Sequence, residues 1–145
     1  SYDSAYVALE GGFKELEVAL KGADIQDGSG LSRQNSVSAD FFCRFLQAMM
    51  CSPHFDTFAA SLPSPGKEGS MLYNMRAYPD DVKERILVKS GSMNGVRCYS
   101  GYIIPTEGTK GETISFSMMV NNCVSPTWKV RPLLDKIMGT LSSYN

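Results

Sequence analysis

The residues best suited to chemistry lie in the stretch 88–96, which reads V-K-S-G-S-M-N-G-V. The triplet Lys89-Ser90-Gly91 follows a short apolar run, and a second strand-like run follows at 98–104. At the end of a strand, such a triplet places an ammonium, a hydroxyl and a bare backbone on one open edge. The ammonium and the hydroxyl can hold a carboxylate, and the backbone can pair with an extended chain. The triplet therefore indicates a binding edge for an anionic, peptide-like ligand.

The composition bounds what this chain can do. Its 145 residues, 43% of them hydrophobic, can build one domain with a real core but not two comfortable ones. With 14 basic and 15 acidic residues the net charge is −1, which argues against a nucleic-acid partner. No apolar run approaches the roughly 18 residues that a membrane span needs. No basic-then-apolar signal sequence opens the chain.

The four cysteines lack the spacing of a metal site, so we expect no bound metal. Cys43 and Cys51 would lie about 12 Å apart along one helix, which is too far for a disulfide. Cys98 and Cys123 lie at opposite ends of a predicted hairpin and could approach each other. The favoured interpretation is four buried thiols.

Helical periodicity opens the chain. Apolar residues recur at helical spacing over 6–20, with a break expected at Gly11-Gly12 and a stop at Gly22. The segment 27–35 is too rich in turn-forming residues to be a regular element.

Two further helices and a long connection follow. Ser38-Ala39-Asp40 predicts the start of a helix that runs to about residue 49, and Pro53 begins a shorter one through residue 62. The connection 63–81 is polar and contains Pro and Gly, with a helical turn expected within 69–76. A connection of this length is more often a functional wall than an idle linker.

The last third of the chain predicts a sheet and a helix. Strands are expected at 85–90, 96–105 and 112–121. The turn at 108–111 should join the last two as an antiparallel hairpin. Ser125-Pro126 opens a C-terminal helix with an apolar face over 130–141, and Pro132 is tolerable only within its first turn. The prediction is an α+β fold, in which a small antiparallel sheet of about three strands packs against N-terminal helices and a C-terminal helix.

Two motifs together carry a resemblance. D-G-S-G-L-S-R-Q-N at 27–35 precedes K-S-G-S-M-N-G-V at 89–96, and S-G-Y follows at 100–102. S-L-P, G-S-M and a strand ending V-N-N also fall in order. In these features the chain resembles the C-terminal part of the D-alanyl-D-alanine carboxypeptidase/endopeptidase family, the low-molecular-mass class C penicillin-binding proteins. The resemblance covers nearly the whole chain and implies the penicillin-binding/serine β-lactamase-like transpeptidase fold, with residues 1–145 as a C-terminal portion of a D,D-peptidase domain.

The chain departs from the family pattern in three ways. Ser90 replaces the usual Thr, and Glu68 stands where the family usually has Asp. The family's nucleophilic S-x-x-K and its S-x-N motif normally lie upstream of the D-G-S-G-L-S-R loop, but only 26 residues precede that loop here and they contain neither motif. The sequence 64–67 spells S-x-x-K, but Pro-Gly in a loop cannot bring the lysine beside the serine. The sequence 92–94 spells S-x-N, but it overlaps the Lys-Ser-Gly motif and cannot face it across a cleft. We therefore expect the nucleophile to lie outside this chain.

The resemblance implies catalytic roles for four residues. Lys89 should hold positive charge in the cleft and support proton transfer. Ser90 and Ser92 should offer hydroxyl donors to a terminal carboxylate. The Ser92 backbone N–H should be an oxyanion-hole donor, and Gly91 should let the substrate backbone come close.

The resemblance also implies a pocket beside the acyl donor, formed by Ser29, Gly30, Leu31, Arg33, Met93 and Asn94. Arg33 could pair with a carboxylate on the peptide stem. The alternative is a purely structural turn, in which Asp27 caps neighbouring N–H groups and Arg33 anchors the loop. His54 is interpreted as a surface residue at a helix start. Core packing, not a cofactor, is the expected role of Met71, Met75, Met118, Met119 and Met138.

The function implied is a serine-type D-Ala-D-Ala carboxypeptidase that acts through an acyl-enzyme on peptidoglycan stem peptides ending in D-Ala-D-Ala. Such an enzyme needs no metal or cofactor, acts in the periplasm or another extracytoplasmic compartment, and is inhibited by β-lactams when intact. One alternative is a non-catalytic remnant that binds stem peptides. Another is endopeptidase, transpeptidase or β-lactamase-type activity in the intact parent. The 145 residues alone are expected to be inactive.

Overall fold

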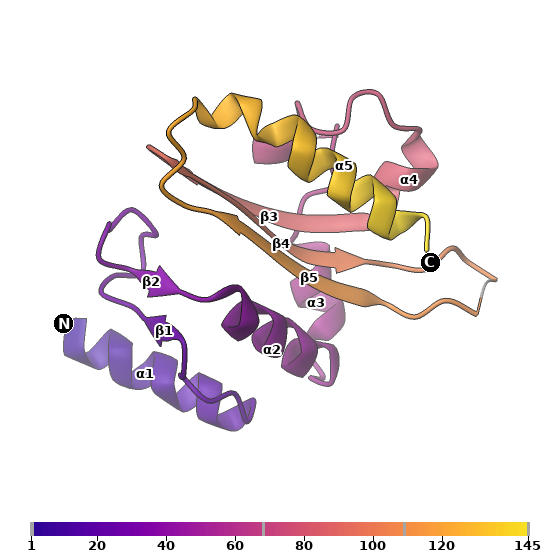
Figure 1. Cartoon of the computed structure of the whole chain (residues 1–145). Helices are drawn as coiled ribbons and strands as arrows, with labels where there is room; N and C mark the ends of the chain where they lie inside the picture. The colour runs from indigo at the N-terminus through magenta and orange to yellow at the C-terminus, as the bar shows by residue number, and fades with distance from the viewer. Residues whose placement is uncertain (1, 68, 109, 145) are drawn as a thin grey trace.

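A three-stranded antiparallel sheet lies between two layers of helix (Figure 1). The structure is a computed structural model that describes residues 2–67, 69–108 and 110–144, with side chains from Ser4 onward. Helix α5 (Arg131–Ser142) covers one face of the sheet, and α2 (Ala39–Met50) and α3 (Phe55–Ala60) cover part of the other. The predicted α+β fold is confirmed.

The sheet has the order β3-β4-β5, so β3 is an edge strand. Its strands are β3 (Ile86–Met93), β4 (Val96–Ile103) and β5 (Ile114–Val120). The predicted antiparallel hairpin of the last two strands is confirmed. The predicted end of the first strand at Ser90 is wrong, because a tight turn at Asn94-Gly95 closes the β3–β4 hairpin three residues later. The Lys-Ser-Gly triplet therefore lies within an edge strand, not at its end.

One face of the sheet forms the main core, under α5. Its buried members are Met71, Met75, Ile86, Val88, Tyr99, Ile103, Phe116, Leu134 and Met138. The prediction that Met71, Met75 and Met138 fill the core is confirmed, and Met118 packs against the same cluster. Met119 is half-buried and points to the other face, as its pairing with Cys98 shows.

The other face is joined to α2 and α3 through Tyr102. This fully buried ring meets Phe55 and Phe58 edge-on, with centroids 5.2 and 6.3 Å away. Its hydroxyl donates to the Leu46 carbonyl at 2.8 Å, and burial raises the pKa of Tyr102 to about 12. At the start of α2 the Ser38 hydroxyl accepts from the Phe41 N–H at 3.1 Å, which confirms the predicted helix start.

The first helix, α1, spans Tyr2–Glu15, so the predicted range 6–20 is wrong at both ends. The Gly11-Gly12 pair lies inside the helix and does not break it. The chain leaves the helix through Glu17, whose φ is +56°. Beyond it two short strands, β1 (Ala23–Asp24) and β2 (Ser36–Val37), pair across the predicted loop 27–35. They were not predicted, because two-residue strands leave no periodicity in a sequence.

The connection 63–81 contributes residues to the hydrophobic core as well as to the surface. It contains the short 3-10 helix η1 (Gly69–Met71), which confirms the predicted helical turn, and it leads into the unpredicted helix α4 (Asp80–Glu84). Met71 and Met75 are almost fully buried, at 0% and 1% exposed. Glu68, one of the noted departures, and Thr109, in the predicted turn 108–111, lie outside the described residues.

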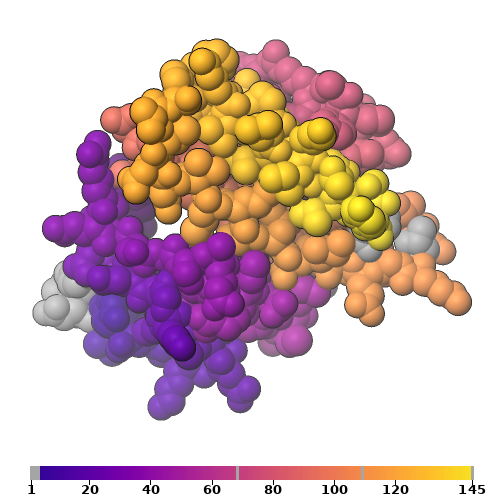
Figure 2. All heavy atoms as spheres, viewed as in Figure 1, coloured from indigo at the N-terminus to yellow at the C-terminus, as the bar shows by residue number. Residues whose placement is uncertain are grey.

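Helix α5 begins later than predicted. A 3-10 turn, η2 (Thr127–Lys129), precedes it, and Pro132 lies in its first turn, where a missing N–H costs nothing. The predicted apolar face is only half right, because Leu134 and Met138 are buried while Leu133 and Ile137 are 63% and 46% exposed. Leu133 and Ile137 therefore lie on the solvent-exposed side of α5. This helix lies at the surface of the molecule (Figure 2).

All four cysteines are free thiols. Cys51 is exposed and the other three are half-buried, so the expectation of four buried thiols is wrong. Burial raises the pKa of both Cys43 and Cys98.

Candidate functional site

The outer edge of β3 offers unpaired backbone groups. The Val88 N–H points away from β4, because it donates to the Pro63 carbonyl at 3.0 Å. In an antiparallel strand every second residue turns its N–H the same way. The N–H groups of Ser90 and Ser92 therefore point to the outer edge too, beyond the point where Pro63 covers it.

The side chains of Lys89 and Ser90 leave this edge strand on opposite faces. In register Lys89 faces Ser100, on the α2 face, while Ser90 faces Tyr99, on the α5 face. Lys89 is exposed, and its ammonium bends to the edge, where it donates to the Ser90 carbonyl at 2.7 Å. The Lys89 ammonium thus lies along this edge, whereas the Ser90 hydroxyl bonds to Ser70 on the α5 side; their joint role in binding stays a prediction.

Gly91 and Ser92 leave the rest of the edge open, and both are exposed. A Cβ on Gly91 would lie 3.7 Å from the Cys98 Cβ, an ordinary contact. The chain's own packing therefore does not require glycine here. Helix α2 packs on β5 and β4 (Figure 1), and the β3 residues on the same face beyond Leu87, Lys89 and Gly91, are exposed.

The second predicted group, in the loop 27–35, is held by its own hydrogen bonds. Asn35 accepts from the Gln26 and Asp27 N–H groups at 2.7 and 3.1 Å, and its amide donates to the Asp27 carboxylate at 3.0 Å. The Ser29 hydroxyl donates to the same carboxylate and accepts from the Leu31 N–H. Hydrogen bonds from Asn35 and, to a smaller extent, Ser29 lower the pKa of Asp27. The structural role expected for Asp27 fits this arrangement.

Arg33 does not anchor that loop. Its side chain is exposed, and none of the interactions found in the described ranges involves its guanidinium. Leu31 is 73% exposed at the loop tip, next to Gly30, whose φ of +72° makes the turn. The Ser29 hydroxyl, by contrast, is already used inside the loop.

No hydrogen bond, ion pair or ring contact between residues that the structure describes joins the loop 27–35 to β3 or its turn. Met93 is half-buried at the end of β3, and Asn94 is exposed at the hairpin tip. Both the loop and this tip lie toward the left of the molecule in Figure 1.

Neither motif rejected on sequence grounds has catalytic geometry. Residues 64–67 form a turn, in which the Lys67 N–H donates to the Ser64 carbonyl at 3.5 Å and the Lys67 ammonium pairs with Glu84 at 3.0 Å. Ser92 and Met93 lie in β3 itself and Asn94 lies in its turn. His54 is exposed at the start of α3, as predicted.

Sequence reasoning missed Ser70 and a buried polar cluster beside it. The Ser90 hydroxyl donates to the Ser70 hydroxyl at 2.7 Å. Behind this pair Asn74 donates to the Tyr99 hydroxyl at 2.6 Å and to the Asp135 carboxylate at 2.8 Å. The G-S-M match at 69–71 was a signal for Ser70, but nothing in the sequence connects it to Ser90, 20 residues away.

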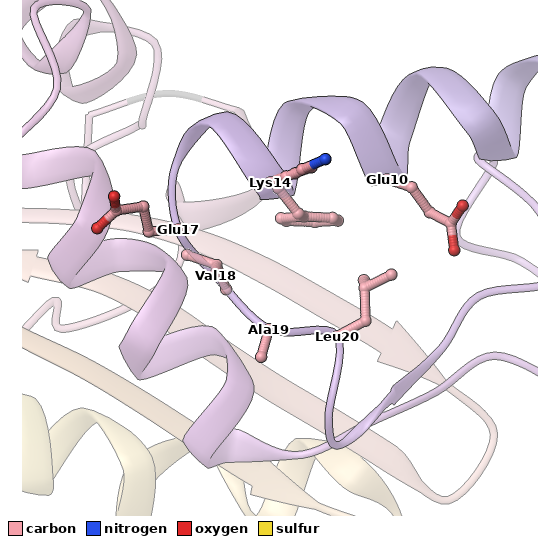
Figure 3. Close-up of a pocket in the computed structure, with 7 residues that line it drawn as sticks. Glu10, Lys14, Glu17, Val18, Ala19 and Leu20 are labelled. Atoms are coloured by element: carbon pink, nitrogen blue, oxygen red, sulfur yellow. The ribbon is translucent and has the colours of Figure 1, made fainter.

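A hollow elsewhere on the surface is separate from the Lys-Ser-Gly edge. A hollow of about 460 Å³ lies where α1 ends, lined by Glu10, Phe13, Lys14, Glu17, Val18, Ala19 and Leu20 (Figure 3). Three of its lining residues are charged and four are apolar, and no residue of the Lys-Ser-Gly edge contributes to it. Among the residues that the structure describes, no cluster of His, Cys, Asp or Glu could hold a metal ion. Over the same residues, no helix has the length and apolar character to cross a membrane.

The comparisons with known proteins point to one family. Residues 1–136 match the D-Ala-D-Ala carboxypeptidase 3 (S13) family. A D-alanyl-D-alanine carboxypeptidase from Actinomadura sp. (strain R39) is 33% identical over 131 residues, which cover 87% of this chain and 23% of that protein. This chain therefore spans less than a quarter of the length of the curated relative.

The fold agrees with solved structures. Two crystal structures of penicillin binding protein 4 from Haemophilus influenzae superpose on 99% of this chain with a TM-score of 0.78, at 18% and 21% identity. The chain covers 33% and 32% of those proteins, and the first is complexed with a β-lactam. The match over residues 1–136 and the 33% identical relative together show that this chain belongs to the D-Ala-D-Ala carboxypeptidase 3 (S13) family.

Proposed function

We propose that this chain forms one wall of the active-site cleft of a serine-type D-Ala-D-Ala carboxypeptidase. The observation that carries the proposal is the open outer edge of β3, where an ammonium, a hydroxyl and an outward N–H meet beside an uncovered sheet face. An extended peptide that ends in a carboxylate matches such an edge, because the backbone can pair with the strand while the polar groups hold the charge.

In this proposal the Ser92 N–H is a donor of the oxyanion hole. It points outward from a rigid strand, as a group that stabilises a developing negative charge must. Loss of one such donor typically costs about 100- to 1,000-fold in rate. Lys89 supplies positive charge beside it and supports proton transfer, and the Ser90 and Ser92 hydroxyls hold the terminal carboxylate.

The nucleophilic serine is supplied from outside these 145 residues. Within them the sequence 64–67 is a turn whose lysine pairs with Glu84 at 3.0 Å, and 92–94 belongs to the wall itself. The open α2 face of β3 is where the second wall would stand. The chemistry is then an attack by that serine on the D-Ala-D-Ala peptide bond, with formation of an acyl-enzyme that water hydrolyses.

The substrate in this proposal is a peptidoglycan stem peptide, met in the periplasm or another extracytoplasmic compartment. The exposed side chains of Leu31 and Arg33 support a pocket for the stem, because Arg33 has no competing partner in the described part of the chain. A carboxylate on the stem is the group that a guanidinium would select. β-Lactams should acylate the same serine and so inhibit the intact enzyme.

The test uses the full-length protein and the isolated chain side by side. The full-length protein should be labelled by a fluorescent penicillin and should release D-Ala from a peptide ending in D-Ala-D-Ala, whereas the isolated chain should not be labelled. Lys89→Ala should lower the rate of labelling by roughly 100-fold or more. Lys136→Ala, which removes an exposed lysine on α5, is the matched control and should leave the rate unchanged.

Three results would count against the proposal. Labelling of the isolated chain would show that the nucleophile lies within it. A Lys89→Ala variant that is labelled at the wild-type rate would remove the role given to Lys89. Binding of the peptide by the full-length protein without labelling or cleavage would favour the alternative of a peptide-binding remnant.

A further inference from the structure

We propose that Ser70 is a positioning residue of this site: it orients the Ser90 hydroxyl and, through it, recognition of the ligand's terminal carboxylate. This inference rests on the proposed function and names a residue that has no role in it so far. It begins from one contact, the 2.7 Å hydrogen bond between the Ser90 and Ser70 hydroxyls.

The bond selects one orientation of a side chain that packing leaves free. A serine side chain has three staggered χ1 positions, and Ser90 is only half-buried on an edge strand. Ser70 is exposed, so this contact joins two surface groups and does not fill a core position. A hydroxyl held in one direction binds an anion at a smaller entropic cost than a rotating one.

Ser70 can act in this way because its own segment is fixed. The next residue, Met71, is fully buried in the main core. Four residues on, the Asn74 amide donates at 2.6 Å to the hydroxyl of Tyr99, which is the direct cross-strand neighbour of Ser90. The segment 70–74 is therefore tied to the sheet at Ser90 and at its neighbour.

The buried Asp135 of α5 holds the far end of the segment. Asp135 is 9% exposed as a residue, and its carboxylate accepts from the Asn74 amide at 2.8 Å and from the Met75 N–H at 2.9 Å. Met75 has a φ of +53°, a left-handed conformation that a non-glycine residue adopts only when its surroundings impose it. A series of hydrogen bonds thus runs from Asp135 in α5 through Asn74 to the sheet, and the contact between Ser70 and Ser90 lies at its exposed end.

The protons show how the pair would work. Without a ligand, the Ser90 hydroxyl donates to Ser70. When a carboxylate arrives, Ser90 donates to it, and Ser70 can turn its own proton toward the Ser90 oxygen, because each hydroxyl is both donor and acceptor. Hydrogen bonds in such a chain strengthen one another, so Ser70 improves Ser90 as a donor to the anion.

The experiment compares two ligands of the full-length protein, benzylpenicillin and its methyl ester, by their second-order rate constants of acylation. Ser70→Ala should slow acylation by the free acid roughly three- to tenfold, the equivalent of one hydrogen bond, and leave the methyl ester unaffected. Ser70→Thr keeps the hydroxyl and should restore the rate with the free acid. Ser143→Ala removes an exposed hydroxyl that bonds only to its own helix end and is the control.

A second variant separates orientation from mere loss of a polar group. Ser90→Thr adds a methyl group that restricts χ1 by itself. If Ser70 acts by orienting Ser90, Ser70→Ala should slow acylation by the free acid clearly less in the Ser90→Thr background than in the wild type. The inference would be overturned if Ser70→Ala slowed acylation by the same factor with and without Ser90→Thr. It would also be overturned if Ser70→Ala slowed acylation by the acid and by the ester equally.

The failure of this inference can be told from failure of the proposed function. A wild-type protein that no penicillin acylates would refute the proposed function, and this inference with it. A wild-type protein that is acylated, with Ser90→Ala slower and Ser70→Ala unchanged on the free acid, would refute only the role of Ser70. Circular dichroism of each variant identifies any change that comes from unfolding.

Discussion

Replacing Gly101 with alanine should disturb the strand that carries the site without touching the site itself. Gly101 is buried in β4 and lies opposite Val88 in register. A Cβ at this position would lie 2.8 Å from the Val88 Cα and 2.9 Å from the Leu87 carbonyl carbon, and closer still to the Leu87 oxygen. All three are backbone atoms of β3, so no side-chain rotation can relieve the contact.

The size of the effect follows from these distances. Carbon atoms pack at about 3.5–4.0 Å, so β3 would have to move away from β4 by roughly 0.6–1.2 Å at Leu87 and Val88. Overpacking of this kind costs about 1–3 kcal/mol, and the rigid backbone places this case at the upper end. Lys89 follows directly, and a displacement of about 1 Å at a reacting centre can cost roughly 100-fold in rate.

Two measurements check this reasoning. Urea denaturation should give a free energy of unfolding about 3 kcal/mol lower for Gly101→Ala than for the wild type. Acylation of the full-length protein by penicillin should fall by more than the unfolded fraction explains. Gly12→Ala is the control, since its Cβ would meet nothing within 4 Å and it lies within α1, where alanine should stabilise by about 1 kcal/mol. A Gly101→Ala variant within 0.5 kcal/mol of the wild type, with normal acylation, would refute the claim that this close approach positions β3.

Three further predictions concern a buried carboxylate, a buried tyrosine and the exposure of two cysteines. Asp135→Ala should lower the free energy of unfolding by about 3 kcal/mol, because it leaves the buried Met75 N–H without its acceptor; a loss below 1 kcal/mol in urea denaturation would contradict this. Because the folded-state pKa of Tyr102 is about 12 and the ordinary value is 10, its stabilising effect should be complete below pH 10 and disappear as the pH rises toward 12. The difference in stability between the wild type and Tyr102→Phe should narrow over that interval, and a constant difference would count against the assignment. Cys51, the exposed thiol, should react with Ellman's reagent before Cys98, whose pKa burial raises, and Cys51→Ser should remove the fast phase.

The parts of the fold that the sequence predicts well are those with a strong local signal. Ser38 before a run of apolar residues predicted the start of α2, and the side-chain cap is present. The strands β4 and β5 have sustained β-type patterns, and their predicted limits lie within two residues of the observed ones. The family followed from the 27–35 and 89–96 motifs, because several side chains at fixed spacing are far more specific than a hydrophobic pattern.

The errors fall where tertiary contacts override the local pattern. The apolar spacing over 6–20 predicted one helix, but the chain turns at Glu17 and the Val18 N–H returns to the Phe13 carbonyl at 2.8 Å. The predicted end of β3 at Ser90 falls three residues short, because pairing with β4 keeps residues 91–93 extended. An edge strand that binds a ligand does not need the apolar residues that mark other strands.

The site could be predicted only in part for a related reason. Lys89, Ser90 and Ser92 share one strand, so their spacing alone places them together. Ser70 reaches Ser90 across 20 residues and Asp135 reaches Asn74 across 61, and no local pattern encodes such a contact. The relation of Arg33 to β3 stays a prediction, because no contact joins them in the described residues.

Successive side chains of β3 point to opposite faces of the sheet, which restricts insertions and deletions within this strand. Lys89 and Ser90 face opposite sides of the sheet because successive residues of a strand do so. Deletion or insertion of a single residue between Ile86 and Lys89 would exchange the two faces, turning the lysine toward the α5 side and the serine toward the α2 side of the sheet. Related proteins should therefore keep this strand free of one-residue insertions and deletions. The connection between β4 and β5 does not determine which face Lys89 and Ser90 lie on, so its length should differ freely among them.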